Sequence, residues 1–215
     1  MGPLEAYSAI VTELGGAPLA ERVAAARVAF QARTGAFGPE DAWFEARSRA
    51  FWDDATTTGG LAGLATGASE EARAWLPALT RAHRGLFVVT TRPREDDATV
   101  LECLLTGVEL FVDDVEAGTR DALLAASAPF DGRVVAAGAP ASTPLRVALL
   151  PGAVFHPEDA AAPIGKVLEV ARTKGLSREQ TLDALLRMEL SLRSLSRVKA
   201  SYAYRVALLQ DIGFP

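Results

Sequence analysis

The spacing of apolar residues changes in the middle of this chain. In residues 1–84 and 157–215, apolar side chains recur every three or four positions, as they do along one face of a helix. In residues 85–156 the period falls to two, and short apolar runs are separated by residues that favour turns. The pattern predicts a β unit held between two groups of helices, and we expect the three segments to form one compact body.

Helix signals divide the first segment into four parts. Each predicted helix begins near a proline or a serine and ends near a glycine, and the four cover approximately residues 3–14, 18–34, 39–55 and 69–84. Ser69 has the position of an N-cap, with Glu70 and Glu71 in the turn that follows. Residues 56–67 are small and lack a period, so we expect an exposed connector there.

The β unit contains five predicted strands. They are short and rich in apolar residues, and they cover residues 86–91, 99–105, 108–112, 133–137 and 145–150. Thr106-Gly107 suits a tight hairpin between the second and the third strand. Because a small open sheet leaves exposed edges, we expect it to close. The predicted fold is α+β, with a small antiparallel β-barrel of the OB or SH3-like kind flanked by helices.

Two helices are expected after the barrel. The first begins near Ala160. Ser177 and Gln180 have the spacing of a capping box, which predicts a second helix that begins at about Arg178. Leucine and tyrosine residues at helical spacing continue its apolar stripe as far as Leu209.

Composition narrows the functional class only slightly. The chain of 215 residues is 49% hydrophobic with a net charge of −5, which suits a globular protein and argues against general coating of nucleic acid. A single cysteine, Cys103, excludes an internal disulfide and suits a reducing compartment. The N-terminus lacks the basic region of a signal peptide, and no apolar stretch approaches the ~20 residues of a membrane span. We therefore expect a cytoplasmic protein without a membrane partner.

The two histidines are candidates for a metal site. His83 and His156 lie at the two boundaries of the β unit, so the fold could bring them together. With Glu158 or Asp159 they would offer imidazole and carboxylate ligands, and a metal-dependent hydrolase is one interpretation. The chain has no HExxH or comparable spacing, however, and isolated histidines more often make structural hydrogen bonds. We therefore expect no metal and no cofactor.

Strand alternation gives Cys103 a structural interpretation. It places the thiol on the same face as Leu101 and Leu105, which predicts that it is buried.

Acidic pairs and glycines carry no recognisable catalytic motif. The pairs at 53–54, 96–97 and 113–114 lack EF-hand spacing, and we expect them on the solvated surface. The glycine-rich segment 59–67 lacks the lysine of a phosphate-binding loop, and the chain contains no GxSxG. No catalytic residue is assigned.

One stretch of the chain carries concentrated positive charge. Residues 187–205 contain five basic residues and one acidic residue, Glu189, so the net charge of this segment is +4 and that of the rest of the chain is −9. The five basic residues are Arg187, Arg193, Arg197, Lys199 and Arg205. Tyr202 and Tyr204 lie among them. A basic helix with tyrosines fits nucleic acid or an acidic partner. The alternative is a solvated face, or pairing with the acidic remainder of the protein.

The third predicted helix carries a large share of the aromatic residues. Trp43, Phe44, Phe51 and Trp52 lie near helical spacing. Such residues usually form core, here at the joint between the helices and the barrel. If they are partly exposed, they are candidate hot spots for a protein partner.

Several segments resemble a known group of proteins when taken in order. These are RTGAFGPEDAWFEARSRAFWDD, LTRAHRGLFVV, LECLLTGVELFV, FDGRVVAAG, FHPEDA and LLRMELSLRSLSR. Together they resemble a family of uncharacterised proteins from myxobacteria and related high-GC bacteria, over about residues 28–205. The resemblance implies the fold described above and no catalytic residue.

These observations favour a non-enzymatic cytoplasmic adaptor or regulatory protein that acts through protein–protein contacts. The candidate contact residues are Trp43, Phe44, Trp52, Arg193, Arg197, Lys199 and Tyr202. The alternatives are a nucleic-acid-binding regulator that uses the basic 187–205 helix, and the hydrolase around His83 and His156. Apolar stripes on the aromatic helix and on the last helix also permit a homodimer.

Overall fold

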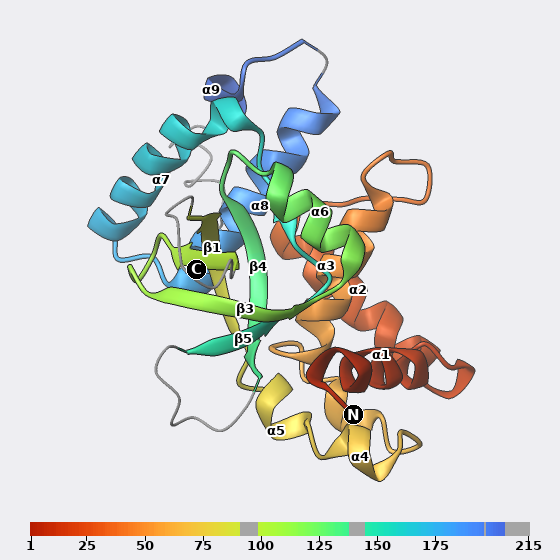
Figure 1. Cartoon of the computed structure of the whole chain (residues 1–215). Helices are drawn as coiled ribbons and strands as arrows, with labels where there is room; N and C mark the ends of the chain where they lie inside the picture. The colour runs from red at the N-terminus through yellow and green to blue at the C-terminus, as the bar shows by residue number, and fades with distance from the viewer. Residues whose placement is uncertain (91–98, 138–144, 196, 205–215) are drawn as a thin grey trace.

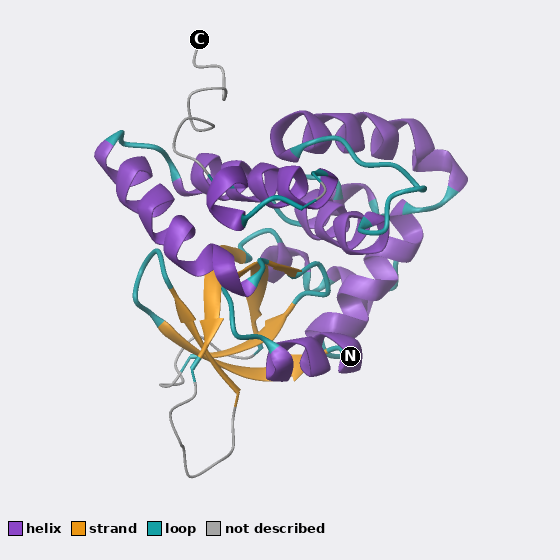
Figure 2. Cartoon of the chain, turned by 90° about the horizontal axis from the view of Figure 1, so that it is seen from above, coloured by secondary structure: helices purple, strands orange, loops and turns teal. Residues whose placement is uncertain are grey.

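A computed structural model describes residues 1–90, 99–137, 145–195 and 197–204. Its strands are gathered into one closed barrel, and helices from both ends of the chain lie along its sides (Figure 1, Figure 2). The predicted α+β fold with a small barrel is confirmed.

The barrel contains five of the six strands found among the described residues. These are β1 (His83–Val89), β2 (Thr99–Cys103), β3 (Glu109–Val115), β4 (Phe130–Ala136) and β5 (Arg146–Leu149). Their order is β1–β2–β3–β5–β4, and pairing of β1 with β4 closes the sheet. The contact between β3 and β5 is parallel, and the other contacts around the barrel are antiparallel. This is the strand order of the OB kind, with α6 (Ala117–Ala125) between β3 and β4.

All five predicted strands are present, and two elements were missed. The short strand β6 (Val154–Phe155) pairs with β4, and its two residues are too few to show a period. Helix α6 buries only Thr119 and Leu123, so its apolar stripe is too narrow to stand out in the sequence.

The N-terminal helices include α1 (Pro3–Leu14), η1 (Ala17–Leu19), α2 (Ala20–Thr34), α3 (Phe44–Thr56), η2 (Ala62–Leu64), α4 (Glu70–Arg73) and α5 (Leu76–Leu79). Ser69 caps α4 as predicted, because its hydroxyl accepts a hydrogen bond from the Ala72 amide. The predicted start at residue 39 is wrong, since α3 begins five residues later. The single helix predicted up to Gly85 is also wrong: the chain forms two short helices, and Gly85 lies within β1.

The connector at residues 56–67 is not the exposed loop that its composition predicts. Leu61, Ala62 and Ala65 are buried in the helical core with Ile10, Phe30 and other apolar residues. Small side chains here allow the connector to pack closely against its neighbours.

The C-terminal helices comprise η3 (Glu158–Ala160), α7 (Ala161–Thr173), α8 (Arg178–Ser194) and α9 (Ala200–Ala203). The capping box of Ser177 and Gln180 is confirmed at the start of α8. The continuous helix predicted towards Leu209 is wrong, because α8 ends at Ser194. Arg197 then has a φ of 61°, a left-handed conformation that no right-handed helix can include. The basic segment is therefore two helices and a turn.

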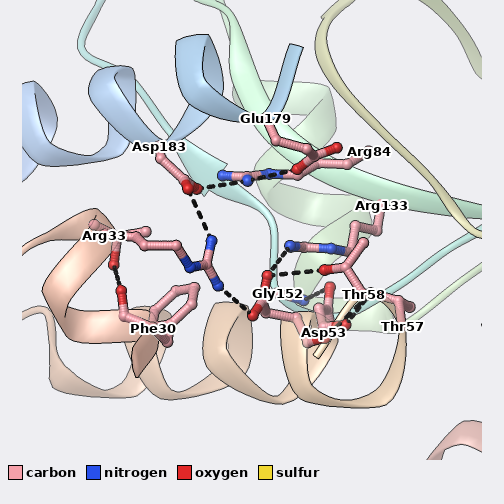
Figure 3. A network of polar contacts seen from close by, with 12 residues as sticks. Phe30, Arg33, Asp53, Thr57, Thr58, Arg84, Arg133, Gly152, Glu179 and Asp183 are labelled. Carbon is pink, nitrogen blue, oxygen red and sulfur yellow. Dashed lines mark hydrogen bonds and ion pairs between the residues drawn. The ribbon is translucent and has the colours of Figure 1, made fainter. Parts of the chain in front are cut away.

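A network of ion pairs, in which every side chain named below except the half-exposed Arg33 is buried, joins the helices to the barrel (Figure 3). Arg84 of β1 donates two hydrogen bonds to Asp131 of β4, at 3.1 and 2.8 Å, and a third to Asp183 of α8 at 2.7 Å. Arg33 of α2 also donates to Asp183, at 2.8 Å, and to Asp54 of α3 at 2.7 Å. Three helices and two strands thus share one set of charges.

The network overturns the surface interpretation of the Asp53-Asp54 pair. Asp54 is 4% exposed and accepts a further hydrogen bond of 2.6 Å from Arg133 of β4, while Asp53 is fully buried. A second buried pair joins Arg47 of α3 to Glu189 of α8. Asp54 and Glu189 are stabilised at these depths by charged partners, which come from distant parts of the chain.

Removal of the central carboxylate should destabilise the whole fold. In Asp54→Asn, the buried Arg133 loses its charged partner, and we expect a loss of about 3–5 kcal/mol in the free energy of unfolding. The exposed pair of Arg146 with Asp113 provides the control, and Arg146→Gln should cost less than about 1 kcal/mol. Urea denaturation of both variants measures the difference. Equal losses would contradict a special role for the buried network.

Candidate functional site

The two histidines do not share a site. His83 lies opposite Val134 on β4, whereas His156 follows Phe155, which lies opposite Phe130. His156 itself hydrogen-bonds to the carbonyl of Pro129, so the two histidines are five residues apart along β4, or roughly 16 Å at the rise of a strand. Among the described residues, no group of three or more His, Cys, Asp or Glu side chains could hold a metal ion.

His156 has a structural environment. It is buried, and its Nδ1 lies 2.6 Å from the hydroxyl of Tyr204. Burial lowers the pKa of His156 to about 4, so the ring is neutral at physiological pH. Of the two acidic residues suggested as its partners, Asp159 instead accepts a hydrogen bond from the Ala200 amide at 3.4 Å. Glu158 is exposed and lines a shallow hollow beside the ring.

His83 has a different partner, the thiol of Cys103. The Cys103 Sγ lies 3.8 Å from Nε2 of His83, and Arg178 lies 3.0 Å from the other ring nitrogen, Nδ1. Cys103 is fully buried in the barrel, as the strand alternation predicts. The pairing with His83 was missed, because it depends on the antiparallel register that sets the start of β1 against the end of β2.

A pocket of about 310 Å³ lies at this end of the barrel. Its polar lining comes from Arg81, His83, Cys103 and Thr106, and the remainder is aliphatic: Val108, Leu110, Val134, Ala136, Leu145 and Val147. Burial raises the pKa of the Cys103 thiol, but hydrogen bonds from His83 and Thr106 outweigh that effect and lower it to about 7. A thiol and an imidazole thus meet at an apolar pocket.

The aromatic residues of the third predicted helix are mainly core. Phe51 is 1% exposed, and the half-buried Trp43, Phe44 and Trp52 pack against the same helical cluster. The guanidinium of Arg27 lies 4.2 Å from the centre of the Phe51 ring. The apolar stripe of α8 is also buried, so both stripes considered for a homodimer are largely used within the chain.

The basic residues of 187–205 divide into two sets. Arg193 pairs with the buried Glu189, and Arg187 donates a hydrogen bond of 2.6 Å to the carbonyl of Arg33. Arg197, Lys199 and Tyr202 instead line a shallow hollow of about 400 Å³. Arg205 lies outside the described residues, as do Asp96 and Asp97.

An acidic groove of about 800 Å³ lies between α1 and the end of β3. Its described lining contains no lysine or arginine, and it includes four carboxylates, Glu5, Glu13, Asp114 and Glu116. Glu5 accepts a hydrogen bond from the Gly2 amide at 2.9 Å, and Glu116 pairs with Arg49 at 2.8 Å. Within the described residues, neither Glu13 nor Asp114 forms an ion pair, so their charges face the groove without a counter-ion. Composition alone could not reveal this groove, since its two sides are a hundred residues apart.

Beneath the groove lies a buried carboxyl group. Tyr7 lines the groove, and its hydroxyl donates a hydrogen bond of 2.6 Å to Asp53. Asp53 also accepts a hydrogen bond from the Gly152 amide at 2.9 Å. Burial raises the pKa of Asp53 to about 7, although these hydrogen bonds and Arg133 act in the opposite direction.

Comparison with known proteins identifies no relative. No family model matches the chain, and no curated protein or solved structure is significantly similar to it. The myxobacterial resemblance therefore stays a prediction. In the part of the chain that the structure describes, no helix has both the length and the apolar character needed to cross a membrane.

Asp53 should make the stability of the protein depend on pH. Between about pH 4 and pH 7 the folded chain holds a proton on Asp53 that the unfolded chain releases, so the free energy of unfolding should fall as the pH rises. Asp53→Asn should flatten this slope, by up to about 1.4 kcal/mol per pH unit. Urea unfolding at several pH values measures it, with the exposed Asp121→Asn as the control. An unchanged slope in Asp53→Asn would refute the assignment.

Proposed function

We propose that the protein is a non-enzymatic cytoplasmic adaptor that holds a basic segment of a partner protein in its acidic groove. One observation carries the proposal: a groove of about 800 Å³ contains four carboxylates, and no described lysine or arginine lines it. The single-cysteine composition and the net charge of −5 are compatible with this role.

The arrangement of charge in the groove favours a cationic partner. Glu13 extends from α1 and Asp114 from β3, so a bound segment would meet negative charge on both sides. Charges of one sign in a cleft attract opposite charge and accelerate association. They also select against acidic partners by repulsion.

The floor of the groove supplies apolar contact as well. Leu4, Val115 and Pro151 line it together with the ring of Tyr7. The Tyr7 hydroxyl stays protonated because burial and the neighbouring Asp53 raise its pKa. A segment that alternates lysine or arginine with aliphatic residues would satisfy both parts of the surface.

Reversal of the two unpaired charges should weaken the binding of a basic peptide. We expect a labelled peptide of alternating arginine and leucine to bind the native protein with an affinity that decreases as salt increases. Glu13→Lys combined with Asp114→Lys should lower the affinity at least tenfold, or about 1.4 kcal/mol. Fluorescence anisotropy across a salt series measures both effects.

The control makes the same charge changes at two exposed residues outside the lining of the groove. Glu169 is exposed on α7, away from the groove (Figure 1), and Glu45 is exposed on α3. Glu169→Lys combined with Glu45→Lys should keep the affinity within about twofold, since its net charge equals that of the groove variant. Equal weakening by both variants would mean that only the net charge of the protein attracts the peptide.

A second candidate function is nucleic-acid binding. Two observations favour it: Arg197, Lys199 and Tyr202 line one hollow, and barrels of the OB kind often bind oligonucleotides. Fold analogy alone is weak evidence, because one fold serves many functions.

Charge reversal in the α8–α9 turn tests this candidate. Arg197→Glu with Lys199→Glu should abolish salt-sensitive binding of a single-stranded oligonucleotide, while Arg22→Glu on the exposed face of α2 should preserve it. Absence of binding by the native protein at low salt would eliminate the candidate.

A further inference from the structure

The mouth of the barrel brings together a thiol, an imidazole and an apolar pocket. Cys103 comes from the end of β2 and His83 from the start of β1, and both line the pocket of about 310 Å³. That volume lies at the lower end of the range for small-molecule sites, about 300–1,000 Å³. Three features of this site bear on the reactivity of the Cys103 thiol.

The first feature is the tautomer of His83, which its hydrogen-bond partners fix. Arginine has donors only, so Nδ1 of His83 must accept the hydrogen bond of 3.0 Å from Arg178. A neutral imidazole then carries its proton on Nε2, which lies 3.8 Å from Sγ of Cys103. His83 is thereby oriented as a hydrogen-bond donor to the sulfur, and a donor favours the thiolate over the thiol.

The second feature is the set of other charged groups near the sulfur. Arg81 is exposed at the rim of the pocket, and Arg178 lies behind the imidazole with Glu179 beside it at 3.4 Å. Among the described residues that line the pocket, there is no carboxylate. These surroundings, which hold cations and no carboxylate, favour the thiolate, and the thiol has a pKa of about 7. A substantial fraction of the thiol is therefore ionised at neutral pH.

The third feature is the space and the character of the walls. Gly85 packs closely against the sulfur, since a Cβ at that position would lie 3.1 Å from Sγ and 2.7 Å from the Phe87 ring, so the pocket supplies the space on the thiol's other side. The walls beyond are aliphatic, with Leu110, Val134 and Val147 among them. A polar reactant would lose hydration on entry, whereas an apolar one would gain from burial.

We propose that Cys103 is a modification site for small apolar α,β-unsaturated carbonyl compounds that enter the mouth of the barrel. The thiolate sulfur forms a bond to the β-carbon of the alkene, and the carbon–carbon π bond breaks. Its electron pair moves to the carbonyl oxygen as an enolate, near the guanidinium of Arg81 at the rim. A proton from water returns to the α-carbon, and the product is a neutral thioether with no change of oxidation state elsewhere.

Alkylation by two maleimides tests the site directly. N-phenylmaleimide and N-carboxyethylmaleimide share one electrophile and differ in the polarity of the tail. Cys103 is the single cysteine, so the mass of the intact chain reports its modification. We expect the ratio of the phenyl rate to the carboxyethyl rate to be at least tenfold higher in the folded protein than in urea. Arg81 favours the anionic reagent, so a preference for phenyl reports the apolar walls.

The pH profile of the phenyl rate tests the role of His83. We expect a midpoint near 7, against about 8.5 for an ordinary cysteine. His83→Phe keeps a ring against Phe87 and removes Nε2, so its midpoint should rise above 8. Arg178→Gln should also raise it, by less, and serves as the second variant if His83→Phe does not fold. Ala136→Phe at the rim should slow the phenyl reagent without moving the midpoint.

Three results would overturn the proposal. The first is a folded protein that reacts with neither reagent while the unfolded chain reacts with both, which would make Cys103 a closed core residue. The second is an equal rate ratio in the folded and unfolded chains, which would exclude an apolar pocket. The third is a midpoint near 8.5 that neither His83→Phe nor Arg178→Gln changes.

Discussion

The buried ion network is the constraint on which the architecture depends. Arg84, Arg133 and Asp131 are buried charged residues on the face of the β-barrel that the helices cover, where isolated charges would be strongly unfavourable. Their partners, Asp54 and Asp183, come from helices at opposite ends of the chain. The barrel therefore requires both helical groups to neutralise the buried charges on its outer face, and the helices require the barrel for the same reason. Charge satisfaction, added to apolar packing, specifies how the three segments are assembled.

The two proposed sites use the barrel in different ways. The acidic groove lies where β3 ends beside α1, so it depends on the packing of the N-terminal helix. The Cys103 pocket lies where β3 begins, and strand ends form most of it. A bound peptide would rest on a joint between elements, whereas a small electrophile would enter the barrel itself. Opposite ends of one strand can thus serve two ligands of unrelated chemistry.

Local patterns predicted the elements better than their partners. The five barrel strands and the capping box at Ser177 follow from period and spacing, which are properties of neighbouring residues. The end of α8 at Ser194 does not, because the helical spacing of apolar residues continues past the turn that Leu195 and the left-handed Arg197 make. The burial of Asp54 could not be predicted either, since Arg133 lies 79 residues away. The pairing of Cys103 with His83 similarly requires the register of two strands, which no single-sequence pattern supplies.

The distance along the chain between charge partners also sets an order of assembly. Arg33 finds one of its carboxylates 150 residues later, and Arg47 finds Glu189 after 142 residues. During synthesis, Arg47 leaves the ribosome long before α8 exists, so its carboxylate partner is absent until the last part of the chain has been made. The last tertiary contacts can form only when α8 emerges. A chain truncated before α8 would retain most of its secondary-structure signals and still lack the residues that complete the fold.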